Sequence, residues 1–196
     1  LRSVGMALFI YEMNNGALPK GIADENGNPL LSWRVRILPL IDRQDLYDQF
    51  HLGEPWNSPH NLKLSKVFVE SYWGPTGLPS TADRSKSSMT TGYLAVRGPG
   101  TVWEEKFGRV DAIAKDDLCL LLVEAVDSGI VWSEPRDLDV RTLSFRIKVD
   151  DGLGLRGDRE VGGVNLLFTN YEVRFLKNKQ VDEDFLRDLV FVRGTS

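Results

Sequence analysis

Residues 1–19, LRSVGMALFIYEMNNGALP, set the start of the fold. Apolar side chains recur in this stretch at three- and four-residue steps, which is the spacing of one face of an α-helix: Leu1, Val4, Leu8 and Tyr11. The helix is predicted to end near Gly16, because Asn and Gly accept the left-handed backbone that terminates helices, and Pro19 opposes a restart. No capping side chain precedes Leu1, so we expect the helix to continue upstream of it.

Residues 32–67 contain further signals for helix starts and stops. Ser32 is predicted to cap a helix that Pro39 interrupts and that resumes around Leu46. Ser58 and Pro59 predict another short helix, since Ser is a favoured cap and Pro a favoured first residue. This part of the chain is therefore predicted to be a series of short helices.

After residue 66 the pattern changes to short segments rich in β-branched and aromatic residues. The strands predicted from them are 67–73, 92–98, 118–126, 129–134, 142–149, 164–168 and 172–176. The acidic first turn of residues 181–190 predicts a closing helix with Phe185, Leu186 and Leu189 on one face. The chain is predicted to be a single α+β domain over 1–196: mainly helical in 1–66, mainly β and mostly antiparallel in 67–180, and helical in 181–190.

Composition argues against some classes of partner. The 28 acidic and 24 basic residues give a net charge of −4 without long blocks of one sign, so no nucleic-acid partner and no anionic lipid surface is predicted. The single cysteine, Cys119, cannot form a disulfide within the chain. It lies in an apolar run, where a buried and unreactive thiol is expected.

Residues 51–60, HLGEPWNSPH, allow two interpretations. His51, Glu54 and His60 could together bind a metal ion, although structural zinc takes four ligands and the chain has only these two histidines. Alternatively, the two prolines around Trp56 form a rigid turn, and polar side chains such as His60 and Asn61 bind local backbone groups. We favour the rigid turn and predict no metal here.

Other patterns are weaker. GLGLRG at residues 152–157 matches the dinucleotide fingerprint, but no helix is predicted after it, so we interpret it as a loop. Acidic pairs occur at 104–105, 116–117 and 150–151, and calcium on such loop oxygens is the one metal or cofactor hypothesis that the sequence leaves open. The tryptophans suit a sugar- or peptide-binding groove or the core, and we favour the core for most of them: Trp33, Trp56, Trp73, Trp103 and Trp132.

Four segments of the chain match the pattern of a known family. The matching residues are Gly5, Ala7, Leu8, Tyr11, Gly16 and Pro19 in the first helix; Ser32, Trp33, Arg34, Pro39, Leu46, Tyr47, Phe50, Glu54, Trp56, Ser58, His60 and Asn61 in the helical block; Gly98, Pro99, Gly100, Thr101, Glu124, Trp132, Glu134 and Pro135 in the centre; and Gly162, Gly163, Asn165, Phe168, Val173, Arg174, Phe175 and Leu176 near the end. On these residues the chain resembles a large bacterial family of unassigned function, domain of unknown function 1559. Its members carry a prepilin-type N-terminal methylation signal and a pseudopilin-like helix followed by a β-rich globular domain. The resemblance covers nearly the whole chain.

The chain departs from this family in two places. Residues 74–76 stand where many relatives have Cys-Pro-Ser, so a disulfide is not expected there. The family's C-terminal signature, a His followed by Asp-Gly, is replaced by Glu160 and by Asn170 and Tyr171. Asp-Gly fits a type I′ turn with positive φ at both central residues, and Tyr171 is sterically disfavoured there. We therefore expect the hairpin of residues 164–176 to form with a different or strained turn.

The resemblance implies a cell-envelope protein that is not an enzyme. It implies a cleavable leader and an apolar helix in the inner membrane upstream of Leu1, so that the present residues form an ectodomain outside the cytoplasm. It also implies protein partners bound through the N-terminal helix, in filament- or secretion-type assembly, or a surface-displayed binding module. The alternative is an envelope-associated hydrolase that uses His60, Glu54 and Glu134, if three family-typical blocks converge on one site. We favour a structural hub, in which these side chains bind backbone groups.

Overall fold

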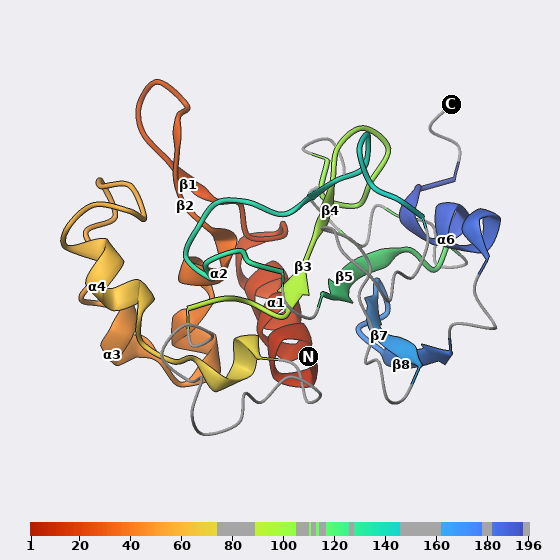
Figure 1. The fold of residues 1–196 in the computed structure, drawn as a ribbon, viewed down its shortest axis with the longest axis horizontal. Coiled ribbons are helices and arrows are strands. Elements are labelled where there is room, and N and C mark those ends of the chain that lie inside the picture. Colours follow the sequence, from red (N-terminus) through yellow and green to blue (C-terminus); the bar gives the residue numbers. More distant parts are fainter. Residues whose placement is uncertain are drawn as a thin grey trace.

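The computed structural model describes residues 1–73, 89–104, 110, 113, 117–125, 128–145, 162–177 and 182–193. These residues form a mixed α+β fold, as the sequence predicted (Figure 1). The helices are α1 (Arg2–Asn15), α2 (Trp33–Arg36), α3 (Gln44–Tyr47), α4 (Asn61–Ser65) and α6 (Glu183–Val190), with the short 3-10 helices η1 (Leu38–Ile41) and η2 (Glu70–Tyr72). The strands are β1 (Ile22–Ala23), β2 (Pro29–Leu31), β3 (Tyr93–Leu94), β4 (Val96–Arg97), β5 (Leu120–Glu124), β6 (Leu138–Asp139), β7 (Gly163–Phe168) and β8 (Val173–Lys177).

Helix α1 forms as its periodicity predicts. The predicted apolar face is buried or partly buried in the core. The helix ends at Gly16, whose φ of 72° is left-handed and whose N–H donates to the carbonyl of Glu12. A Cβ atom on Gly5 would lie only 2.9 Å from Leu167 Cδ1, so the missing side chain allows α1 to approach β7 closely.

The helical block between residues 32 and 66 confirms the predicted interruption at Pro39. Helix α2 ends at Arg36, and Pro39 lies in the first turn of η1. Ser32 Oγ accepts a hydrogen bond from the N–H of Arg34, which caps α2. Helix α4 begins at Asn61 rather than at Pro59, and Ser58 Oγ still accepts from the first helical N–H.

The main sheet is antiparallel, with strand order β3-β5-β7-β8. Strand β7 is paired on both edges, with β5 on one side and with β8 on the other. Two small pairings accompany this sheet: β1 with β2, antiparallel, and β4 with β6, parallel. The β4–β6 pairing brings residues 138–139 beside residues 96–97, two segments far apart in the chain.

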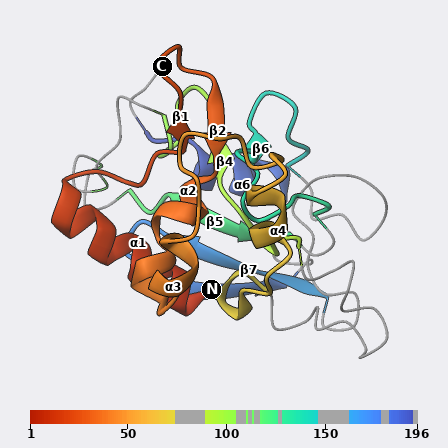
Figure 2. The ribbon, with the colours of Figure 1, turned by 90° about the vertical axis from the view of Figure 1, so that its left-hand side faces the viewer.

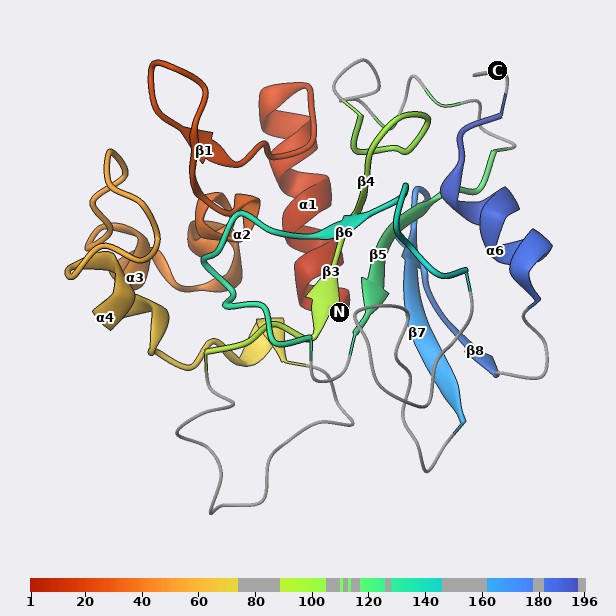
Figure 3. The ribbon, with the colours of Figure 1, turned by 45° about the horizontal axis from the view of Figure 1, so that its top comes forward.

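The main sheet separates two hydrophobic cores. Leu167 of β7 belongs to the core that includes the buried face of α1, whereas Leu166 and Phe168 belong to the core that includes α6. Figures 1 and 3 show α1 and α6 on opposite sides of the sheet, and Figure 2 shows α2 and α3 in front of its strands. Leu186 and Val190 anchor α6 in the second core.

Some element predictions were wrong. Residues 70–72 form η2 rather than part of a strand, because Tyr72 is buried and its hydroxyl donates to the carbonyl of Arg34. Residues 129–134 form only an isolated bridge at Val131. Of the predicted strand 142–149, residues 142–145 form no strand, and residues 146–149 lie outside the described residues. Phe185 is 42% exposed and does not share the buried face of Leu186. Strands β1, β2 and β6 were not predicted.

Several sequence patterns fall outside the described residues. These are the glycine-rich stretch 152–157, the departure from the family at 74–76, Glu160, the acidic pair 150–151, and one member of each of the pairs 104–105 and 116–117.

Candidate functional site

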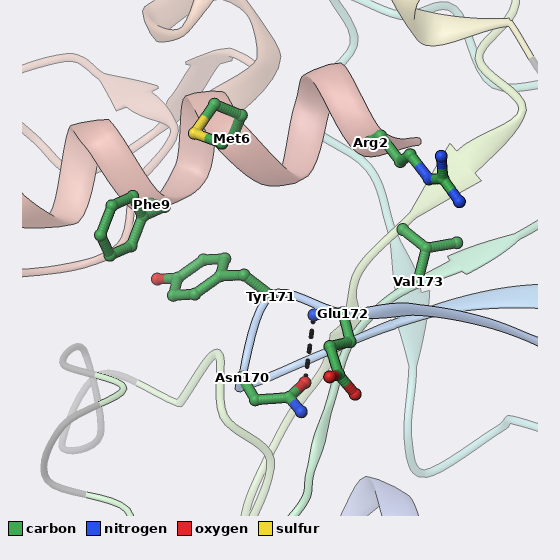
Figure 4. A pocket seen from close by; sticks show the side chains of 7 residues that line it. All are labelled: Arg2, Met6, Phe9, Asn170, Tyr171, Glu172 and Val173. Carbon is green, nitrogen blue, oxygen red and sulfur yellow. Dashed lines mark hydrogen bonds between the residues drawn. The ribbon is translucent and has the colours of Figure 1, made fainter.

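A groove of about 670 Å³ lies between α1 and the hairpin of β7 and β8 (Figure 4). Residues from both elements line it: Arg2, Met6, Phe9, Asn170, Tyr171, Glu172 and Val173. The lining is mostly apolar, and Arg2 and Glu172 add one charge of each sign. Such a lining suits contact with another apolar surface.

One wall of the groove belongs to a stripe of exposed apolar side chains on α1, here called the α1 stripe. Met6, Phe9 and Met13 are 59%, 40% and 70% exposed. They follow one another at steps of three and four residues, which places them on one face of the helix. Because the opposite face is buried in the core, α1 is apolar on both sides. Sequence reasoning identified the buried face and missed this second one.

The other wall depends on Tyr171, whose φ of 62° is unusual for a bulky residue and unfavourable by about 1–3 kcal/mol. Its ring packs edge-on against Phe9, with ring centroids 5.1 Å apart, and its hydroxyl donates to Glu12 Oε2. Glu12 Oε1 accepts from the N–H of Val110 at 2.5 Å. The contacts of Tyr171 with Phe9 and Glu12 tie the tip of the hairpin to α1 and hold the strained backbone in place. Figure 4 shows the rings of Phe9 and Tyr171 at this junction.

The hairpin forms with a turn other than type I′, as predicted. The N–H of Tyr171 donates to the carbonyl of Phe168 at 2.8 Å, and the N–H of Phe168 donates to the carbonyl of Glu172 at 3.1 Å. The loop therefore has three residues, and only its last, Tyr171, has positive φ. Asn170 Oδ1 accepts from the N–H of Glu172 at 3.1 Å, as drawn in Figure 4. The strain thus falls on Tyr171 alone.

The block EPWNSPHN is a rigid turn organised around the buried side chain of Asn61. Asn61 Oδ1 accepts from the N–H of His51 at 3.0 Å. Asn61 Nδ2 lies within donor range of three carbonyls, those of His51, Glu54 and Pro55, at 3.0, 3.1 and 3.2 Å. The N–H of Trp56 donates to Leu30, which attaches the turn to β2. The side chain of Asn61 thus binds local backbone groups, as the rigid-turn hypothesis predicted.

The two histidines stack on each other instead of converging on one point. Their rings are parallel within 2°, with centroids 3.5 Å apart. His60 Nε2 lies 2.8 Å from the carbonyl of Gln49, so this nitrogen carries the proton and donates. His51 Nδ1 lies 2.9 Å from Glu54 Oε1. Hydrogen bonds from Ser58 and then from His51 lower the pKa of Glu54. Among the described residues, no group of three or more His, Cys, Asp or Glu side chains is placed to hold a metal ion.

The residues of the hydrolase hypothesis bind different partners in the structure. Glu134 Oε1 pairs with Arg136 Nε at 2.8 Å, and Glu134 Oε2 accepts from the N–H of Val131 at 3.3 Å. Within the described part of the chain, Glu134 makes no hydrogen bond to His60 or Glu54. The three side chains therefore do not form one hydrogen-bonded cluster.

Three family-typical blocks do converge, but on Asp137, a residue that sequence reasoning missed. The side chain of Asp137 is 3% exposed and accepts three hydrogen bonds: from Trp33 Nε1 at 3.1 Å, from Arg34 Nη2 at 2.6 Å and from the N–H of Ala95 at 3.0 Å. The Arg34 guanidinium is fully buried and also donates to Ser32 Oγ and to the carbonyl of Tyr93. This cluster joins α2 to the segments that carry β4 and β6.

The remaining predicted residues have structural contacts. Gly98 and Gly100 have φ of 134° and 79° on either side of Pro99, and Gly162 has φ of 66°. A Cβ on Gly163 would lie 2.3 Å from the ring of Phe175. The others are distributed over the fold: Trp132 packs against Phe50 and Tyr72, Asn165 donates to buried Glu124, Arg174 pairs with Glu172, and Pro135 lies beside Asp137 in a second cavity.

Cys119 is buried, as predicted, and burial raises the pKa of its thiol to about 11. Its thiol is therefore protonated at neutral pH and unreactive.

The comparisons with known proteins identify one family. A model described as "Protein of unknown function (DUF1559)" matches residues 1–116. No curated protein and no solved structure matches the chain. No helix in the described ranges is both long and apolar enough to cross a membrane.

Proposed function

The chain belongs to the DUF1559 family of proteins of unknown function, and from that premise we propose that it is a non-enzymatic, pseudopilin-like subunit of the cell envelope that assembles through its first helix. The observation that carries this proposal is the α1 stripe, because three large apolar side chains on one face of a helix are costly to leave in water. The proposed occupant of the groove is α1 of a second copy of this chain.

The shape and chemistry of the groove support that occupant. Side chains at steps of three and four residues form the ridges by which helices pack against each other. Methionine side chains are flexible and adapt to an opposing surface. Arg2 and Glu172 offer a cation and an anion on the rim, so two copies of the same surface can pair opposite charges.

In this proposal an apolar segment upstream of Leu1 anchors the protein in the inner membrane and places the domain outside the cytoplasm. The family resemblance supports this anchoring. It is tested by expressing the gene with its natural upstream sequence and following the protein by membrane fractionation and by protease added to the outside of spheroplasts. Recovery of the protein in the cytosolic fraction would contradict the envelope location.

The assembly itself is tested by site-specific disulfide formation. Met13→Cys introduces an exposed thiol on the stripe, and the buried Cys119 provides an unreactive background. We expect a covalent dimer on mild oxidation of Met13→Cys at micromolar protein concentration, and its loss when Met6→Glu is added. The matched control is Glu25→Cys, an exposed position on the loop between β1 and β2. Equal dimer formation by the control, or none by Met13→Cys, would show that α1 is not the interface.

A further inference from the structure

A second cavity, of about 190 Å³, lies beside the Asp137 cluster. The loop region of β1 and β2 forms one side of it, and Trp33, Pro135 and Asp137 form much of the rest, together with Arg97. Residues from the three family-typical blocks therefore meet at this cavity. The cavity is separate from the α1 stripe, and its interpretation is independent of the function proposed above.

Arg97 lies in the cavity wall, and the described residues leave its Nε–H without a hydrogen-bond acceptor. Its guanidinium carbon lies 5.4 Å from the centre of the Trp103 ring, and Trp103 is itself fixed by a hydrogen bond from Nε1 to the carbonyl of Leu121 at 2.7 Å. Arg97 Nε lies 3.6 Å from Asp137 Oδ2, which is longer than a hydrogen bond, and this buried nitrogen has no partner among the described residues. The side chain is 40% exposed, so the outer edge of the guanidinium is open to solvent.

Among the described residues, Asp137 and the two arginines that pair with it carry one positive charge in excess; Arg97 and Asp137 line the cavity, and Arg34 lies buried against Asp137. Arg34 and Arg97 contribute two cations, and Asp137 contributes one anion. The carboxylate of Asp137 is already occupied by Trp33, Arg34 and the N–H of Ala95. Within the described part of the chain, Arg97 is therefore balanced by a carboxylate whose hydrogen bonds go to other donors.

We propose that this cavity binds the carboxylate of a small organic acid, with Arg97 as the anchoring residue. A guanidinium presents two parallel N–H groups that match the two oxygens of a carboxylate. The excess charge of one cation balances a monoanion, whereas a dianion such as phosphate would leave one negative charge unbalanced and would be repelled more strongly by Asp137 than a monoanion is. The ring of Trp103 beneath Arg97 orients the guanidinium in advance, which lowers the ordering cost of binding.

The test uses propionate as the probe and propionamide as its uncharged analogue of similar shape. Binding is followed by NMR, through the indole N–H signal of Trp33 and the Nε–H signal of Arg97, at constant ionic strength set with chloride. We expect saturable shifts of both signals with propionate and none with propionamide. Inorganic phosphate at pH 7 should bind more weakly than propionate.

Variants separate the site from general charge effects. Arg97→Gln removes the anchoring cation and should weaken propionate binding by about tenfold or more, the loss expected for a charged, two-point hydrogen bond. Arg97→Lys keeps the positive charge but lacks the two parallel N–H groups, and it should weaken propionate binding by a smaller factor. Arg136→Gln removes the same charge from a neighbouring exposed residue that pairs with Glu134, and should leave binding unchanged.

Three results would overturn the proposal: equal shifts with propionamide, unchanged propionate affinity in Arg97→Gln, or equal loss in Arg136→Gln. If Arg97→Gln fails to fold, Arg97→Lys is the deciding variant. A propionate affinity of Arg97→Lys equal to that of the natural chain would exclude a bidentate site. None of these variants alters the α1 stripe, so the outcome is independent of the dimerisation experiment.

Discussion

Arg34 Nη2 lies 2.6 Å from Asp137 Oδ1, and the two side chains are 0% and 3% exposed. This ion pair joins α2 to the segment before β6, across 103 positions of the chain. A buried charge without its partner is strongly unfavourable, because neither water nor another ion replaces the lost interaction. The pair therefore fixes how the helical block docks against the sheet.

Replacing one member of this pair should destabilise the fold severely. Asp137→Ala leaves the Arg34 guanidinium without its buried counter-ion, and we expect a loss of about 3–5 kcal/mol in the free energy of unfolding, measured by urea denaturation. Arg174→Ala, which breaks the exposed pair with Glu172, is the control and should cost less than about 1 kcal/mol. Similar losses in the two variants would show that the Asp137 cluster is not a structural centre.

Tyr171 should be stabilising in spite of its backbone strain. Tyr171→Gly relieves the backbone strain of the positive φ but removes the contact with Phe9 and the hydrogen bond to Glu12. We therefore expect a net loss of stability. Tyr171→Phe keeps the ring and should cost about 1–2 kcal/mol through the lost hydrogen bond. In a Phe9→Ala background, Tyr171→Gly should cost less unfolding free energy than it does in the natural chain. Urea denaturation of the natural chain, the two single variants and the double variant would measure this difference. A stability gain from Tyr171→Gly in the natural background would contradict this account.

Asn61 should matter more to stability than His60, although both belong to the same turn. Asn61→Ala removes bonds to one backbone N–H and to the nearby carbonyls in a buried position, and we expect a loss of about 2–4 kcal/mol in the free energy of unfolding. His60→Ala removes one exposed hydrogen bond, to Gln49, and should cost about 1 kcal/mol or less. Thermal or urea unfolding of the two variants checks the order, and a larger cost for His60→Ala would reverse the assignment.

Local signals in the sequence predicted the elements that depend on neighbouring residues. The end of α1 at Gly16, the cap at Ser32 and the break at Pro39 follow from backbone conformation and capping chemistry, which act within a few residues. The departure from a type I′ turn was anticipated for the same reason, since positive φ is sterically disfavoured at a bulky residue; Tyr171 adopts it as the last residue of a three-residue loop.

Contacts between residues far apart in the chain determine the structural features that local sequence signals did not predict. Residues 67–73 have the composition of a strand, but burial of Tyr72 and its bond to Arg34 impose η2 there. In the sequence, Asp137 cannot be told from an ordinary acidic residue of a surface loop, because its partners Trp33 and Arg34 are more than a hundred positions away. The α1 stripe is visible in the sequence as a three- and four-residue spacing, but the spacing does not tell which of two apolar faces is buried. In the fold, α1 approaches β7 closely through Gly5 and Leu167, and the stripe is left exposed.

The exposed pair of Asp139 and Arg141 gives a prediction for acid pH. Hydrogen bonds from the Arg141 side chain, and next from its backbone N–H, lower the pKa of Asp139 from 3.8 to about 2. Because the folded-state pKa is the lower one, the stabilisation is fully present above about pH 4 and is lost as the pH falls through about 2. Both groups are exposed, so the effect on stability is small.

We therefore expect the Asp139 carboxyl carbon, followed by NMR, to titrate with a midpoint near 2 in the natural chain. In Arg141→Gln the side-chain bonds are lost while the backbone N–H remains, so the midpoint should rise part of the way towards 3.8. The difference in unfolding free energy between the two chains should be constant from pH 7 to about pH 4 and should narrow below that, because protonated Asp139 no longer attracts Arg141. A midpoint that does not move in Arg141→Gln, or a difference that grows as the pH falls, would mean that Arg141 is not the cause of the lowered pKa.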